Sequence, residues 1–219
     1  MNTTFKFLKD LAANNDRTWF HAHKKEYQAA RGEFLRQVED LIVAISAFDP
    51  PIIEMEPADA VFRINRDTRF SKDKAPYKTN FGAFMTDRGR KVARAGYYFH
   101  VEPGKCFVAG GLYMPPAPEL RAVREALAED AAPFRKIIGR KAFKEAFGGE
   151  LPGDRLKTAP RDYSIDHPDI DLLRLKSFEI ASEVSDRDVK GANFTKQATR
   201  QFKLMQDYIH WLNAALDRA

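Results

Sequence analysis

The chain is poor in cysteine, with Cys106 as the only one among 219 residues. One cysteine excludes an internal disulfide framework and a multi-cysteine metal site. It is typical of a reducing compartment, so we expect a cytoplasmic protein. Long hydrophobic runs are also missing, because LIVAISAF and CFVAGGLYM fall far short of the roughly 18 residues that a membrane-spanning helix needs. We therefore expect no membrane as a partner.

The common phosphate-binding and cofactor motifs are also absent from the sequence. Gly110 and Gly111 are followed by no Lys-Ser or Lys-Thr pair that would complete a P-loop, and no G-x-G-x-x-G occurs. The first twenty residues lack the basic start and apolar block of a secretory signal. These absences leave ATPase and dinucleotide-binding functions without a motif, and we predict no cofactor.

What the chain has in excess is positive charge within one segment. Residues 63–94 hold ten lysines and arginines against three aspartates, a net +7, whereas the whole chain carries +5. The rest of the chain is therefore slightly acidic. Because nucleic-acid binding usually needs a basic surface spread over a whole domain, this local concentration favours a small anionic ligand.

Hydrophobic periodicity predicts an α+β fold in a single domain over residues 1–219. We expect a mainly antiparallel central sheet, since the Pro-Gly turn in EPGK joins two strands, with helices segregated around it. The N- and C-terminal helices should pack together. In chain order we expect helical sequence over 1–50, with its longest helix over 17–47, and then sheet-forming sequence over 52–114, with a strand over 61–66. After these we expect helices over 117–147, turns over 148–170, a strand over 175–184 and a closing helix over 188–216.

The segment FRINRDTRFSKDKAPYKTNFG, residues 62–82, contains three arginines and three lysines but only two aspartates. We predict that Arg63 lies on a strand and that residues 67–80 form a long irregular loop, because Pro76 biases the residue before it away from helix. Loops of this length are uncommon in compact domains unless they are functional. The planar guanidinium group of arginine suits phosphate and carboxylate groups, so this loop is a candidate anion-binding element.

Two interpretations of the basic segment remain open. In the first, its cations converge on one anionic group while acidic and aromatic neighbours orient them. The predicted anion-binding residues are Arg63, Arg66, Arg69, Lys74 and Lys78, and the predicted orienting residues are Asp67, Asp73 and Tyr77. In the second, the segment is a salt-bridged surface loop that only stabilises the fold. Arg174 and Lys176 would extend the anion site if the last strand lay beside Arg63.

The motif RINRDTRFSKDKAPYKTNFG resembles the signature of a bacterial family catalogued as domain of unknown function 2461. That signature is R-x-x-R-D-x-R-F, a short gap, Asp or Asn followed by Lys, and then Tyr. The matching positions are Arg63, Arg66, Asp67, Arg69, Phe70, Asp73, Lys74 and Tyr77. The segments GYYFHVEPGKCFVAGGLYMPP and DHPDIDLLRLKSF are similar to later parts of the family. The resemblance implies no reaction and no ligand, but it implies that these polar positions belong together, which favours the anion site.

Other polar residues are candidates for acid–base chemistry. Tyr98, His100 and Glu102 alternate along one predicted strand and therefore share a face, where histidine can exchange protons near neutral pH. The alternative is the ordinary solvent face of a sheet. The weak catalytic candidates are Asp67, Asp73, His100 and Glu102, and no general acid or base can be assigned among them.

One acidic cluster has residue types that bind metals. Asp166, His167 and Asp169 are weak candidates for metal ligands in the segment DHPDID. Helix capping explains the cluster more simply, because acidic side chains complement the positive end of a helix dipole. We predict no metal site.

Three functions from different classes remain. The first is an anion-recognising domain that binds the phosphate or carboxylate group of a small molecule and could be an enzyme of unassigned reaction. The second is a nucleic-acid-binding module that uses residues 63–94 with Lys196, Arg200 and Lys203. The third is a structural or interaction domain whose arginine network only stabilises the fold. We choose the first, and the sequence leaves the oligomeric state open.

Overall fold

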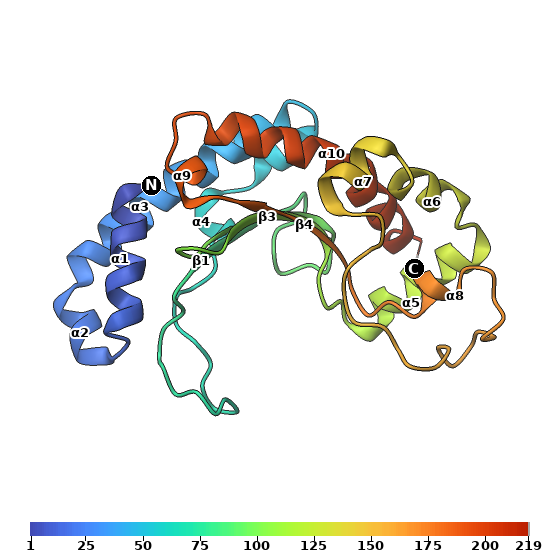
Figure 1. Cartoon of the computed structure of the whole chain (residues 1–219), viewed down its shortest axis with the longest axis horizontal. Helices are drawn as coiled ribbons and strands as arrows, with labels where there is room; N and C mark the ends of the chain where they lie inside the picture. The colour runs from blue at the N-terminus through green and yellow to red at the C-terminus, as the bar shows by residue number, and fades with distance from the viewer. Residues whose placement is uncertain (219) are drawn as a thin grey trace.

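Four antiparallel strands form one sheet in the order β1-β2-β3-β4. They are β1 (Phe81–Met85), β2 (Gly96–Val101), β3 (Cys106–Leu112) and β4 (Phe178–Val184). Figure 1 shows the computed structural model, which describes residues 1–218. The first three strands form a meander, and β4 adds at the edge farthest from β1. The α+β class and the antiparallel sheet are confirmed.

Helices precede and follow this sheet. Before β1 come α1 (Asn2–Ala13), α2 (Arg17–Ala22), α3 (Lys24–Ser46), the 3-10 helix η1 (Pro50–Glu54) and α4 (Pro57–Ala60). Between β3 and β4 come α5 (Ala117–Glu129), α6 (Ala132–Ile138), α7 (Lys141–Phe147) and α8 (Ile170–Leu173), and after β4 come α9 (Asp186–Val189) and α10 (Phe194–Leu216). Within residues 1–218, no helix has the length and apolar character to cross a membrane.

The two longest helices, α3 and α10, cover one face of the sheet (Figure 1). Side chains alternate along a strand, so Phe99 of β2 points toward these helices. Its ring centroid lies 5.6 Å from that of Phe34 in α3 and 4.8 Å from that of Phe194 in α10. Gln37 also donates a hydrogen bond of 3.0 Å to Thr195 between the two helices. The predicted packing of N- and C-terminal helices is therefore confirmed.

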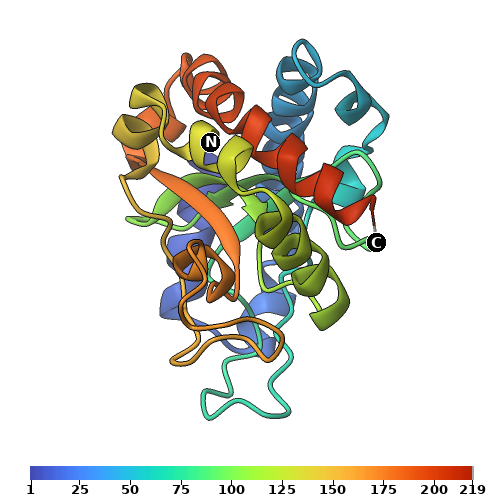
Figure 2. The same cartoon turned by 90° about the vertical axis from the view of Figure 1, so that its right-hand side faces the viewer.

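The opposite face of the sheet presents half-buried aromatic and polar side chains, which we call the open face. It contains Phe84 of β1, Tyr98 and His100 of β2, and Phe107 of β3. Strand alternation turns these residues away from α3 and α10. Residues 62–80 extend from the sheet on this side, as Figures 1 and 2 both show. The segment with the highest charge therefore projects beside the open face.

Several element boundaries differ from the sequence expectations. The helix expected over 17–47 is divided into α2 and α3 at His23, whose φ of −106° and ψ of 28° are not helical. The expected strand over 61–66 has only isolated bridges at Val61 and Asn65. The closing helix is divided into α9 and α10 by a turn that contains Gly191, and β4 begins at Phe178 rather than at 175. Local periodicity identified these regions but not their breaks.

A glycine allows β3 and β4 to approach closely. Gly111 has φ +119°, which L side chains rarely adopt, and it pairs with Glu179 of β4. A Cβ atom at this position would lie 2.0 Å from the carbonyl oxygen of Phe178. The join between the meander and β4 therefore requires glycine at position 111.

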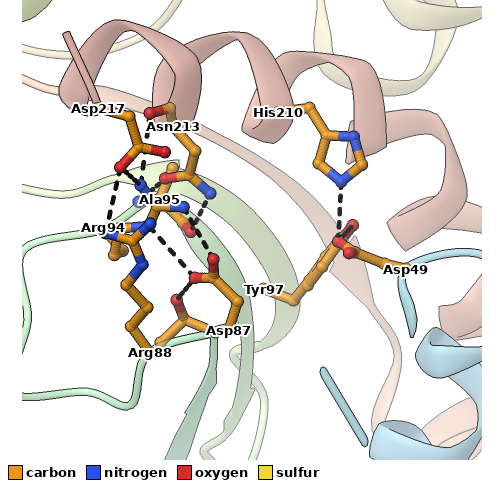
Figure 3. A network of polar contacts seen from close by, with 10 residues as sticks. Asp49, Asp87, Arg88, Arg94, Ala95, Tyr97, His210, Asn213 and Asp217 are labelled. Carbon is orange, nitrogen blue, oxygen red and sulfur yellow. Dashed lines mark hydrogen bonds and ion pairs between the residues drawn. The ribbon is translucent and has the colours of Figure 1, made fainter. Parts of the chain in front are cut away.

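The end of α10 is attached to the start of β2 by a buried arginine (Figure 3). Arg94 is only 7% exposed, and its guanidinium donates to Asp87 at 2.8 Å and to Asp217 at 2.7 Å. The side-chain amide of Asn213 makes two hydrogen bonds, of 2.9 Å and 3.2 Å, with the backbone of Ala95. These contacts fix the C-terminal helix on the sheet.

A second polar contact in Figure 3 connects α10 to the chain just after α3. The buried carboxylate of Asp49 accepts a hydrogen bond of 2.8 Å from the hydroxyl of Tyr97. It also lies 3.2 Å from Nε2 of His210 on α10. Because these groups satisfy one another, we interpret the network as structural.

Candidate anion-binding site

Residues 62–80 leave the sheet as two chains that pair near their base and are joined at the tip by the irregular loop expected from the sequence, and we call the whole segment the basic ribbon. The amide of Lys78 donates to the carbonyl of Ile64 at 2.8 Å, and the amide of Arg66 donates to the carbonyl of Pro76 at 2.9 Å. At its base, the amide of Phe62 donates to the carbonyl of Gly82 in β1 at 2.9 Å. The ribbon therefore continues the sheet outward from its β1 edge.

Two contacts fix the base of the basic ribbon to the N-terminal helices. The ring of Tyr77 stacks on that of Phe20 in α2, with centroids 4.0 Å apart. The side-chain amide of Asn15 donates to the carbonyl of Tyr77 at 2.9 Å and accepts from its amide at 3.1 Å. Tyr77, predicted as an orienting residue, is buried and anchors the ribbon itself rather than contacting a cation.

Two of the predicted anion-binding arginines form ion pairs within the ribbon. Arg69 donates to both oxygens of Asp67, the shortest contact being 2.6 Å. Arg66 donates to the carboxylate of Asp73. Hydrogen bonds from Arg69 hold the pKa of Asp67 below its usual value, and the backbone amide of Ala75 together with Arg66 lowers the pKa of Asp73. Both carboxylates therefore remain charged and balance these arginines.

Lys74 is also engaged within the ribbon. Its ammonium group donates to the carbonyl of Thr68 at 2.9 Å and is otherwise exposed. This contact closes the tip of the ribbon across the turn. Lys74 therefore contributes charge to the tip, away from the ribbon base.

Two cations lie against the ring of Phe62 at the base of the ribbon, and a third, Arg63, is close enough to affect Lys78. The ammonium nitrogen of Lys78 lies 5.5 Å from the ring centroid of Phe62, and the guanidinium carbon of Arg90 lies 5.0 Å from it. Within residues 1–218, no carboxylate oxygen lies within 4.0 Å of the side-chain nitrogens of Lys78, Arg90 or Arg63. Burial, with the charges of Arg63 and Arg90, lowers the pKa of Lys78. In residues 1–218, these three cations therefore form no ion pair with a carboxylate.

Arg90 and Phe62 are not among the site residues that the sequence predicts. Arg90 lies in the loop between β1 and β2, and its Nε donates to the carbonyl of Asp59 at 2.7 Å. This contact holds the guanidinium over Phe62. The excess charge of residues 63–94 included Arg90, but only the fold of the loop brings it beside Lys78.

Tyr98, His100 and Glu102 form a row of polar contacts on the open face, as their alternation predicted. The hydroxyl of Tyr98 lies 3.0 Å from Nδ1 of His100, and Nε2 of His100 lies 3.7 Å from a carboxylate oxygen of Glu102. Thr79 donates to Glu102 at 3.0 Å, and Phe107 stacks on the imidazole with centroids 4.5 Å apart. Burial lowers the pKa of His100 although Glu102 raises it, and burial raises the pKa of Tyr98 to about 12.

The cations near Phe62 and the row of Tyr98, His100 and Glu102 are adjacent. The ring of Phe62 packs edge-on against Tyr98 with centroids 6.2 Å apart. Asn80, two residues after Lys78, places its side-chain nitrogen 3.5 Å from Nδ1 of His100. A Cβ at Gly82 would lie 2.4 Å from the hydroxyl of Tyr98, so glycine provides the space for that hydroxyl. We call these cations and the polar row together the candidate site.

Arg174 and Lys176 lie elsewhere in the fold. Arg174 donates to the carbonyl of Leu156 at 2.6 Å, and Lys176 lies 4.0 Å from Asp154. Both residues precede β4, which is at the opposite edge of the sheet from β1 and the ribbon. The condition for extending the site, a last strand beside Arg63, is therefore not met.

The acidic cluster considered for metal binding forms other contacts. Asp169 and Asp171 each accept a hydrogen bond of 2.6 Å from Arg135. The ring nitrogen Nδ1 of His167 accepts from the amide of Asp169 at 3.1 Å, and the amide of Asp166 donates to Ser164. In the part of the chain that the structure describes, no group of three or more His, Cys, Asp or Glu side chains is arranged to hold a metal ion.

The basic residues considered for nucleic-acid binding do not form one surface. Lys196, Arg200 and Lys203 are exposed on α10. Because α10 covers the face of the sheet opposite the open face, these residues and the basic ribbon lie on different sides (Figure 1). A single duplex or strand would have to pass around the sheet to contact both.

Comparisons with known proteins identify a family but no function. A family model described as "Conserved hypothetical protein (DUF2461)" matches residues 3–211. No curated protein and no solved structure matches the chain. The matched region contains the basic ribbon, the open face and all four strands.

Proposed function

Because the chain belongs to the family of conserved hypothetical proteins DUF2461, whose description gives no reaction, we propose its function from the geometry of the candidate site. The protein recognises the phosphate or carboxylate group of a small molecule. The observation that carries this proposal is the pair of Lys78 and Arg90 over the ring of Phe62, with Arg63 near Lys78. Within residues 1–218, none of the three has a carboxylate oxygen within 4.0 Å. An anion placed among them would remove their mutual repulsion.

The surroundings of these cations favour anion binding over simple solvation. Phe62 covers one side of the ammonium group of Lys78, and an aromatic face holds a cation by cation–π attraction. Because Lys78 is half-buried, its charge is less screened than a fully exposed one. Arg63 and Arg90 supply the planar donor groups that match phosphate and carboxylate oxygens.

The paired residues of the ribbon have a supporting role in this proposal. Arg66, Arg69 and Lys74 add positive potential that attracts anions toward the ribbon base. Their contacts with Asp73, Asp67 and the carbonyl of Thr68 connect the two chains and the tip of the ribbon. Direct binding is therefore assigned to Arg63, Lys78 and Arg90.

The affinity for sulfate, phosphate and acetate should fall with each cation near Phe62 that is replaced by a neutral residue. We expect Lys78→Met and Arg90→Met each to weaken the affinity about tenfold, as expected for a hydrogen bond to a charged group. Isothermal titration calorimetry gives the dissociation constants, and circular dichroism checks that each variant is folded.

Lys72→Met is the matched control for this experiment. Lys72 is exposed at the ribbon tip, so its replacement removes the same charge without touching Phe62. We expect its affinity to stay within about twofold of wild type, because a distant exposed charge is largely screened. The proposal is wrong if the wild-type protein binds none of the three anions, or if Lys72→Met weakens binding as much as Lys78→Met.

A further inference from the structure

The polar row beside the cations lies outside the hydrophobic core, and its contacts with Thr79 and Asn80 connect the basic ribbon to β2. Tyr98, His100 and Glu102 lie on the open face, where each could instead be hydrated, and not on the core face that contacts α3 and α10. Water still reaches this row, because the side chains of His100 and Glu102 are 13% and 26% exposed. Three side chains are nevertheless held in sequence by contacts of 3.0 Å and 3.7 Å. Such an ordered row on a surface beside a binding site is typical of acid–base groups.

The contacts define which nitrogen of His100 accepts a proton. The hydroxyl of Tyr98 and the side-chain nitrogen of Asn80 both approach Nδ1. Both groups can donate, so we assign Nδ1 as the acceptor and place the ring proton on Nε2, which faces Glu102. Phe107, stacked on the imidazole, keeps the ring in this plane.

The same short segment supplies both the cation cluster and the polar row. Lys78 and Asn80 are two residues apart, and their side chains reach Phe62 and His100 respectively. The ring of Phe62 then contacts Tyr98. A small molecule whose anionic group lies at Lys78 and Arg90 therefore extends over Phe62 toward the hydroxyl of Tyr98.

We infer that Tyr98, His100 and Glu102 transfer a proton to and from the bound anion, and that the ligand is a small phosphorylated or carboxylated molecule with a hydroxyl group near its anionic end. This inference rests on the proposed function. The ligand hydroxyl gives its proton to the oxygen of Tyr98 while Tyr98 gives its own proton to Nδ1 of His100. The O–H bond of the ligand is broken, and the O–H bond of Tyr98 is replaced. Glu102 balances the imidazolium, and the proton returns from Nδ1 of His100 through Tyr98 to the ligand oxygen.

Coupling between the bound anion and the charge of His100 follows from this arrangement. An anion stabilises the imidazolium, so its affinity should rise as the pH falls through the pKa of His100, and binding should raise that pKa by the same coupling. Tyr98 stays protonated in this range because its pKa is about 12. The charged groups that act on His100 are Glu102, one residue after β2, and Lys105 in the turn between β2 and β3. Glu183 of β4 lies opposite Phe107, and Lys78 and Arg90 lie on the far side of Phe62 and Tyr98.

Two sulfate esters that differ by one hydroxyl test the inference. Ethyl sulfate and 2-hydroxyethyl sulfate keep a constant charge between about pH 5.5 and pH 8, so any pH dependence belongs to the protein. We expect 2-hydroxyethyl sulfate to bind about fivefold more tightly than ethyl sulfate, and its affinity to rise about fivefold over this range as the pH falls. Calorimetry on the full chain measures both differences.

Three variants assign the effects to residues. Tyr98→Phe should lose the preference for the hydroxylated ester and keep the binding of ethyl sulfate. His100→Gln should lose the pH dependence. Gly82→Ala should act like Tyr98→Phe, because its methyl group would displace the hydroxyl of Tyr98.

The wild-type protein alone also gives a decisive measurement. The NMR titration of the His100 imidazole should show a higher pKa when 2-hydroxyethyl sulfate is bound. If both esters bind equally at every pH and the imidazole titration does not move, the inference is overturned while the proposed anion site remains. If neither ester binds, the proposed function itself fails.

Discussion

Alanine at position 111 is expected to destabilise the protein by about 3 kcal/mol or more, because it combines a strained backbone with a clash in a packed region. Gly111 has φ +119°, and the added methyl carbon would lie 2.0 Å from a carbonyl oxygen of β4. Backbone atoms cannot move aside as a flexible side chain can, so β3 and β4 would have to separate. Urea unfolding followed by circular dichroism measures the free energy of unfolding.

The variant Gly104→Ala measures the cost of backbone strain without a steric clash. Gly104 also has a positive φ, of +81°, but an added Cβ there would meet no atom within 4 Å. This variant should lose only about 1 kcal/mol, the usual cost of placing alanine in this conformation. Equal losses in the two variants would mean that the close approach of β3 and β4 is unimportant.

Arg94→Met is expected to destabilise the protein by about 2–3 kcal/mol near neutral pH. Arg94 is 7% exposed, and its removal leaves the carboxylates of Asp87 and Asp217 without their main partner. These carboxylates are 24% and 43% exposed, so water partly replaces the arginine and the loss stays below that of a fully buried pair. Unfolding in urea at neutral and acidic pH tests this expectation.

The acid dependence of Arg94→Met follows from the two carboxylates. The pKa of Asp217 is lowered mainly by its hydrogen bond with Arg94, and the pKa of Asp87 is lowered because contacts with Arg94 outweigh the opposing effect of burial. Depressed pKa values stabilise the fold above the ordinary carboxylate pKa, and this stabilisation is lost as the pH falls through the folded-state values. The difference between wild type and variant should therefore shrink below about pH 4.

Arg88→Met is the matched control for Arg94→Met. Arg88 contacts the same carboxylate of Asp217 at 3.1 Å, but its side chain is 54% exposed. An exposed pair of this kind contributes little, so the variant should lose no more than about 0.5 kcal/mol. If Arg88→Met is as destabilising as Arg94→Met, burial of the guanidinium does not explain its contribution.

Local patterns in the sequence identified most helices and strands of the fold but not the breaks within them. The alternation of Tyr97, Phe99 and Val101 with Tyr98 and His100 predicted which side chains share a face of β2, and the structure confirms it. Apolar periodicity likewise identified the helices that cover the sheet. Both signals depend only on residues within a few positions of one another.

Contacts between distant residues were not predictable in this way. The ribbon is held by a hydrogen bond between Ile64 and Lys78, which no short pattern encodes. Arg90 joins the candidate site only because the β1–β2 loop contacts the carbonyl of Asp59. Arg63 and Lys78 could therefore be predicted as site residues, but Arg174 was predicted wrongly with them, because its distance from the ribbon depends on strand order.

The construction of the basic ribbon has a consequence for a cleaved form of the protein. Its tip exposes Arg69, Lys72 and Lys74, and trypsin cleaves the peptide bonds that follow such residues. Its base, in contrast, is fixed by the sheet and the N-terminal helices. A cut at the tip would divide the chain into two fragments that remain packed together. One fragment would keep Arg63 and the other Lys78, so a bound anion would act as an electrostatic bridge between two separate polypeptides.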